Sequence, residues 1–166
     1  AIEYDGVETV QIIFNMFRQR PAEKFFSMAK AGNIGIIVRV PLASGLLTGK
    51  FDKQTSFPET DHRNFNRDGQ AFDKGETFAG IDYEAGLAAV EELKKEFHDT
   101  YSLPQYALKW ILMFDEVSTV IPGASKPEQV LSNIKASEIP PITQEQMHRV
   151  NAIYEEHIKQ EVHQRW

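Results

Sequence analysis

A small, backbone-exposed loop precedes a helical pattern in the carboxyl-terminal part of the chain. The stretch VIPGASKPEQVLSN, residues 120–133, reads as a short apolar strand, then Gly-Ala-Ser at 123–125, then a helix. Peptide N–H groups and the positive end of the helix dipole would meet at this loop and could bind an anion without a buried lysine. Gln129 and Asn133 lie four residues apart, on one helix face. They suit adenine or ribose edges better than a metal, although an ordinary turn with surface amides gives the same pattern.

A second small loop follows another apolar run, in RVPLASGLLTGK at residues 39–50. Pro41 ends the predicted strand, small residues at 43–45 leave backbone amides reachable, and Lys50 adds a positive charge. Phe51 follows Lys50, so the stretch is not a Walker A loop, and no G-x-G-x-x-G occurs. Two such loops after successive parallel strands are better evidence than one, because active sites of barrels gather at that end of the strands.

A polar residue, Gln11, interrupts the apolar run VETVQIIF at residues 7–14. A glutamine inside a buried strand needs a hydrogen-bonding partner. That partner is either a ligand or a neighbouring backbone group, and the residues alone leave both open.

The elements that must position these residues alternate between strands and helices. Continuous apolar runs predict parallel strands that are covered on both faces. Strands are expected at 7–14, 34–40 and 117–122, helices at 20–32, 82–97, 102–114, 126–136 and 143–157, and a long irregular segment at 41–80. This order predicts the α/β class, with parallel (β/α) units and right-handed crossovers. Three strands leave open sheet edges, and a complete (β/α)₈ TIM barrel needs at least about 200 residues. The pattern therefore predicts the C-terminal portion of such a barrel, residues 1–166, with the last three units present and the first five absent.

Composition narrows the class of protein further. The 166 residues suit one domain with a packed core, and the net charge of -6 without a basic stripe disfavours a nucleic-acid partner. The chain has no cysteine, which excludes disulfides and thiolate metal sites and is consistent with a cytoplasmic location. No apolar run predicts a membrane span, and no histidine pair predicts a metal site. The chain does not begin with Met, so we expect a fragment.

The motifs taken together resemble the aldo-keto reductase superfamily. The resemblance rests on TVQIIFNMFRQRPAE, GIIVRVPLASGLLTGKF, ALKWIL and VSTVIPGASKPEQVLSNI, and it runs over nearly the whole chain. It implies a (β/α)₈ barrel that binds NADP(H) without a Rossmann motif, of which this chain is similar to the part from the sixth strand onward. It also implies an oxidoreductase that reduces aldehydes or ketones to alcohols.

The resemblance also implies where the cofactor would bind. In the family pattern, Gln11 corresponds to a residue that bonds the nicotinamide carboxamide, and residues 40–44 correspond to the loop along the pyrophosphate. Lys50 corresponds to a residue near a cofactor phosphate, and residues 123–133 correspond to the segment around the adenosine end. The implied cofactor-binding residues are Gln11, Arg39, Val40, Pro41, Leu42, Ala43, Ser44, Lys50, Gly123, Ala124, Ser125, Gln129, Ser132 and Asn133.

Two of these positions depart from the family pattern. Arg39 stands where an aromatic residue usually stacks on the nicotinamide, and its charge would repel the oxidised ring and favour the reduced cofactor, unless Arg39 faces a substrate anion. Gly123 and Ala124 stand where several members carry Lys-Ser, which leaves NADP against NAD open.

The resemblance places the catalytic residues outside this chain. Family members use a tyrosine acid with a lysine, an aspartate and a histidine, all from the first half of the barrel, and no tyrosine here falls at the end of a predicted strand. We therefore expect no catalytic residue and no metal in these 166 residues, and a carbonyl substrate only for the complete protein. The alternative is a non-catalytic half-barrel that binds a nucleotide or self-assembles as a homo-oligomer through its open sheet edges.

Overall fold

A parallel three-stranded sheet with helices packed around it forms the centre of the computed structural model, which describes residues 2–165. The strands are β1 (Thr9–Ile13), β2 (Gly35–Arg39) and β3 (Val117–Val120). The helices are α1 (Phe25–Ala31), α2 (His62–Phe65), α3 (Tyr83–Glu96), α4 (Leu103–Ile111), α5 (Pro127–Ile134), α6 (Gln144–His157) and α7 (Lys159–Val162). Among the described residues, no helix combines the length and apolar character that crossing a membrane requires.

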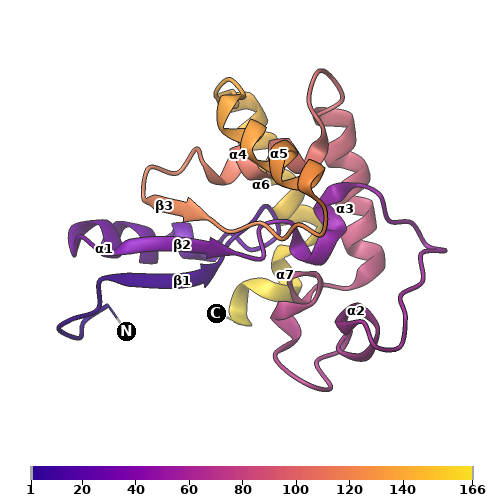
Figure 1. The fold of residues 1–166 in the computed structure, drawn as a ribbon, viewed down its shortest axis with the longest axis horizontal. Coiled ribbons are helices and arrows are strands. Elements are labelled where there is room, and N and C mark those ends of the chain that lie inside the picture. Colours follow the sequence, from indigo (N-terminus) through magenta and orange to yellow (C-terminus); the bar gives the residue numbers. More distant parts are fainter. Residues whose placement is uncertain (1, 166) are drawn as a thin grey trace.

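The strands lie side by side in the order β1-β2-β3, and each neighbouring pair is parallel. Gln11 pairs with Ile37, and Ile13 pairs with Arg39, so β1 and β2 end together. All three arrows point the same way in Figure 1, which brings the loops after the strands together at the carboxyl-terminal end of the sheet. The predicted α/β class with parallel (β/α) units is confirmed.

The two faces of the sheet differ in burial. On β2, Ile36 and Val38 are completely buried, whereas Ile37 and Arg39 on the opposite face are partly exposed. The prediction of strands covered on both faces is therefore wrong, because within residues 2–165 the helices cover only the Ile36 face. Gln11 lies on the open face and is exposed, so it does not need the buried partner that was expected for it.

An aromatic cluster fills the covered side of the sheet. Phe14, which follows β1, stacks on Trp110 of α4 at 5.0 Å between ring centroids and meets Phe26 of α1 edge-on at 4.7 Å. All three side chains are at most 2% exposed. Such ring pairs add about 0.5–1.5 kcal/mol beyond the apolar area that they bury. The cluster fixes both helices against the sheet, which in turn positions the strand ends.

The helix starts follow the capping signals in the sequence. The Ser102 N–H donates to the Gln105 side chain at the start of α4, and Thr143 and Gln146 bond reciprocally at the start of α6. The helix expected at 20–32 is shorter, with a 3₁₀ turn at Arg20–Ala22 and then α1, because Lys24 between them has a non-helical backbone.

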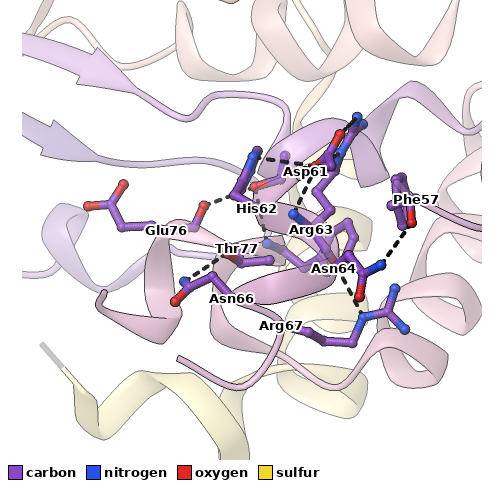
Figure 2. Close-up of polar contacts among 11 residues, drawn as sticks. Phe57, Asp61, His62, Arg63, Asn64, Asn66, Arg67, Glu76 and Thr77 are labelled. Atoms are coloured by element: carbon purple, nitrogen blue, oxygen red, sulfur yellow. Dashed lines mark hydrogen bonds and ion pairs between the residues drawn. The ribbon is translucent and has the colours of Figure 1, made fainter. Parts of the chain in front are cut away.

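The long segment 41–80 is more ordered than an irregular loop. It contains α2 and three 3₁₀ elements, at Ala43–Thr48, Lys74–Glu76 and Phe78–Gly80. We call residues 57–78 the strap. Asn66 holds the strap together: it is completely buried and donates to the Thr77 hydroxyl (Figure 2). Its Oδ1 also accepts the backbone N–H groups of Ala71 and Phe72.

Candidate cofactor site

A cleft of about 740 Å³ lies at the edge of the sheet where the strands end. The loops after β2 and β3 form one side, and the strap contributes four side chains to the other. Its lining residues are Val40, Pro41, Leu42, Ser44, Gly45, Thr48, His62, Arg63, Phe72, Glu76, Gly123, Ala124, Ser125 and Gln129. The structure thus brings together the two small loops that the sequence singled out.

The loop after β2 is held in a strained conformation. Val40, Ala43 and Ser44 have φ angles of 52°, 47° and 53°, in the left-handed region that β-branched residues rarely adopt. The completely buried Asn15 side chain fixes this loop, because its Nδ2 donates to the Val40 carbonyl at 2.9 Å and its Oδ1 accepts the Phe17 N–H at 2.8 Å. Sequence reasoning missed Asn15, although an asparagine directly after an apolar strand was a visible signal.

Ser44 joins this loop to the strap. Its hydroxyl donates to the Glu76 carbonyl oxygen at 2.9 Å and accepts the Phe78 N–H at 3.1 Å. Ser44 was expected on the pyrophosphate loop, and it does line the cleft. Its side chain, however, already makes both of these bonds within the chain, so the hydroxyl holds the strap in place.

Arg39, at the end of β2, forms a two-point ion pair with Glu76 of the strap. The guanidinium donates through Nη1 to Glu76 Oε2 at 2.5 Å, and Nη2 pairs with Oε1. The hydrogen bonds to Glu76 raise the pKa of Arg39 above its usual value. Arg39 was expected to meet either the nicotinamide or a substrate anion, and within the chain its guanidinium is paired with the Glu76 carboxylate.

The loop after β3 is open and exposed. Nothing lies within 4 Å of the position that a Cβ on Gly123 would take. Gln129 Oε1 accepts the N–H groups of Ser125 at 2.6 Å and Lys126 at 3.2 Å, so these amides are not free as the sequence suggested. Within residues 2–165, the N–H groups of Gly123 and Ala124 make no hydrogen bond to the chain, which leaves both available to a ligand.

The remaining predicted site residues lie outside the cleft lining. Ala43 is buried beneath the loop, Lys50 is exposed, and Gln11 is exposed on the open sheet face. Asn133 lines a different groove, between α4, β3 and α5, so the structure does not bring it and Gln129 into one cavity. Ser132 is half-buried, and its carbonyl accepts a bond from Gln105.

The strap places a held cation beside the cleft. Arg63 donates to both oxygens of Asp61, at 2.9 Å and 2.6 Å, and lies 4.5 Å from the centre of the Phe57 ring (Figure 2). The Arg63 hydrogen bond lowers the pKa of Asp61 to about 2. Arg63 and His62 both line the cleft, opposite the loop after β3. Neither residue was among the predicted cofactor-binding residues.

The described tyrosines lie away from the cleft lining. Tyr106 donates to Asp99 at 2.5 Å, and burial together with that bond raises its pKa to about 12. Tyr154 is buried, which raises its pKa to about 12, and its hydroxyl bonds His163 Nδ1 at 3.0 Å. Neither phenol is placed to protonate a substrate in this cleft. His157 of α6 is half-buried, with Nε2 3.1 Å from Glu92 Oε1.

The residues of the cleft fit a dinucleotide. Two backbone N–H groups beside an open glycine accommodate a phosphate at close approach. Arg63, although paired with Asp61, keeps its Nη1 for a ligand in the cleft, and Phe72 offers a flat apolar surface. This donor set is nitrogen-rich, whereas oxygen-ligated metals need several carboxylates or carbonyls.

Comparison with known sequences decides the family. The sequence model described as Aldo/keto reductase family matches residues 3–155. The chain belongs to the aldo/keto reductase family. Relatives include the uncharacterised oxidoreductase YqkF of Bacillus subtilis, 25% identical over 162 residues, which covers 98% of this chain and 46% of the relative. L-glyceraldehyde 3-phosphate reductase of Escherichia coli is 34% identical over 103 residues, or 62% of this chain and 28% of the relative.

Solved structures agree with this assignment. A glycerol dehydrogenase of Gluconobacter oxydans matches with a TM-score of 0.72 and 28% identity, over 90% of this chain and 43% of that one. An aldo-keto reductase of Bacillus halodurans, in its holo form, shares the fold with a TM-score of 0.64 and 24% identity, over 94% of this chain and 47% of that one. The chain therefore spans less than half the length of the relatives it matches.

Proposed function

We propose that this chain is the cofactor-binding C-terminal part of an NADP(H)-dependent aldo-keto reductase that reduces aldehydes or ketones to alcohols in the cytoplasm. The observation that carries the proposal is the cleft at the ends of β2 and β3, in which the open Gly123 loop faces the strap. Family membership supports a nicotinamide cofactor.

Each part of the cleft has its own task in this proposal. The free N–H groups of Gly123 and Ala124 bind a phosphate, and the strained loop at residues 40–45 supports the pyrophosphate from the side of β2. Arg63 favours NADP over NAD, because its Nη1, which makes no bond to Asp61, can donate to an additional phosphate. Gln11 and Arg39, on the open sheet face, lie at the nicotinamide end.

The bound cofactor supplies the hydride. The chain's own contribution is to orient the cofactor and to cover it with the strap, which keeps water from the cleft. The general acid that protonates the carbonyl oxygen comes from outside residues 2–165, since no tyrosine of this part lines the cleft. The 166-residue chain by itself should therefore bind the cofactor and not turn over a carbonyl substrate.

Binding of NADPH to the purified 166-residue chain tests this proposal through the change in nicotinamide fluorescence. The matched variant is Gly123→Val, because Gly123 lines the cleft and a Cβ there has nothing of the protein within 4 Å. We expect saturable binding by the unmodified chain and at least about tenfold weaker binding by the variant, equivalent to about 1.4 kcal/mol. Equal binding by both would place the cofactor elsewhere, and robust carbonyl turnover would contradict the assignment of the acid to another part.

A second candidate function is self-assembly as a homo-oligomer, which the exposed apolar residues next to β3 favour. Ile121, Val130, Leu131 and Ile134 are each at least 46% exposed on the β3–α5 side. Together with the edge strands they form a surface that association would cover. Light scattering tests this second candidate. Leu131→Lys should shift an oligomer towards the monomer. An unmodified chain that is monomeric at all concentrations would rule out self-assembly.

A further inference from the structure

The Arg39–Glu76 pair joins the end of β2 to the strap at one end of the cleft. The Arg39 guanidinium and the Glu76 carboxylate meet through both oxygens, and the two side chains remain 32% and 28% exposed. Glu76 lines the cleft and Arg39 does not, so a ligand in the cleft meets the pair on its Glu76 side. It is also the place where the chain departs from the aromatic residue that the family pattern predicts.

Glu76 is fixed through its backbone as well as its side chain. Its carbonyl oxygen accepts the Ser44 hydroxyl at 2.9 Å, and Ser44 in turn accepts the Phe78 N–H. A carboxylate held from both ends loses little further entropy when it pairs with Arg39. Exposed ion pairs are weak mainly because two long side chains must be ordered. The Glu76 carboxylate is therefore held in a fixed position beside Arg39.

The charge at this position affects the two redox forms of a nicotinamide cofactor differently. The reduced ring is neutral and the oxidised ring carries a positive charge, while the phosphates are the same in both. An unpaired guanidinium beside the ring would repel only the oxidised form, whereas the Arg39–Glu76 pair has no net charge.

We infer that Glu76 sets the relative affinity of the site for oxidised and reduced cofactor by neutralising Arg39. Glu76 is a positioning residue, because it acts through Arg39. This inference rests on the proposed function, since it needs the nicotinamide to reach the Arg39 end of the cleft. It also reverses the expectation from sequence, in which a free arginine would favour the reduced cofactor.

The test is the ratio of two dissociation constants, for NADP⁺ and for NADPH, measured by calorimetry on the 166-residue chain. In Glu76→Gln the amide keeps the shape and loses the charge, so the ratio should rise by about tenfold, or about 1.4 kcal/mol. The increase should shrink at high salt. The effect of a charge change on the phosphates cancels in the ratio, because both cofactor forms carry the same phosphates, and the effect on the nicotinamide ring remains.

Three variants separate the charge of Glu76 from its structural role. Glu76→Asp keeps the carboxylate and should restore a ratio close to that of the unmodified chain. Glu84→Gln removes a similar carboxylate, paired with Lys53 at 3.1 Å outside the cleft, and should leave the ratio unchanged. The double variant Arg39→Met/Glu76→Gln, like the unmodified pair, has no net charge at these two positions and should show a ratio close to that of the unmodified chain.

The outcomes distinguish the two proposals. If Glu76→Gln weakens both cofactor forms equally, Glu76 only holds the strap, and the inference is overturned while the proposed function stands. If the unmodified chain binds neither form, the proposed function itself fails, and the inference fails with it. If the double variant Arg39→Met/Glu76→Gln keeps the raised ratio of Glu76→Gln, the effect does not come from the charge of Arg39 and the inference is wrong.

Discussion

The loops after β2 and β3 look alike in the sequence and differ in the structure. Both carry small residues directly after a parallel strand. The loop after β2 is strained, its Ala43 is completely buried, and Asn15, Ser44 and Glu76 tie it to the rest of the chain. The loop after β3 is exposed, and of its residues Ser125 is held locally by Gln129.

Small residues therefore have two separate causes at this edge of the sheet. Gly45 has a φ of 99°, and a Cβ there would lie 2.9 Å from the Phe51 ring, so the protein itself requires the glycine. At Gly123 the same atom would meet nothing, so the fold does not require a small residue there. Space that the protein leaves unfilled is the stronger sign of a ligand. The predictions below test whether the two loops separate in this way.

Loss of Asn15 should produce the largest effect. Asn15→Ala leaves the Val40 carbonyl and the Phe17 N–H without their partner and releases the strained loop after β2. We expect the free energy of unfolding to fall by about 2–3 kcal/mol, measured by urea denaturation. Asn64→Ala is the control, because its single bond to the Phe57 carbonyl is exposed, and it should cost about 0.5 kcal/mol. Equal losses would show that the β2 loop needs no buried support.

The paired substitutions Gly45→Ala and Gly123→Ala compare the loops directly. The first adds a methyl group at a left-handed φ and against Phe51, so it should lower the free energy of unfolding by about 1–3 kcal/mol. The second should change it by less than about 0.5 kcal/mol. Thermal unfolding of both variants measures the difference, and a comparable loss at Gly123 would remove the argument for an open ligand cradle.

Gln129 should affect both stability and binding. Gln129→Ala removes the acceptor for the Ser125 and Lys126 N–H groups at the start of α5, which should cost about 1 kcal/mol of stability and weaken NADPH binding. Gln146→Ala removes the equivalent cap of α6, away from the cleft, and should reduce stability alone. Unchanged binding in Gln129→Ala would mean that the β3 loop does not hold the cofactor.

The smallest effect concerns the Asp61–Arg63 pair on the strap side. Since Arg63 lowers the Asp61 pKa from 3.8 to about 2, the pair contributes stability above about pH 3.8, and this contribution is lost as pH falls through about 2. An NMR titration of the Asp61 carboxyl carbon should show the low pKa, and Arg63→Gln should raise it towards 3.8. A normal pKa in the unmodified chain would mean that Arg63 is not held beside the cleft.

Features set by neighbouring residues were predictable from the sequence. The order of strands and helices follows from short-range patterns and is confirmed. The open sheet face was not predictable, because an apolar run does not reveal which of its two faces the rest of the chain covers. The exposed Gln11 is the direct consequence.

The sequence by itself determined that two loops of small residues follow two adjacent parallel strands, because strand periodicity and parallel pairing depend on local pattern and chain order. Only the tertiary structure decided what each loop does. The Asn15–Val40 and Arg39–Glu76 contacts join residues 25 and 37 positions apart, and such partners are chosen by the packing of the whole chain. Those contacts hold the loop after β2 against the rest of the chain, whereas the loop after β3 stays open to a ligand.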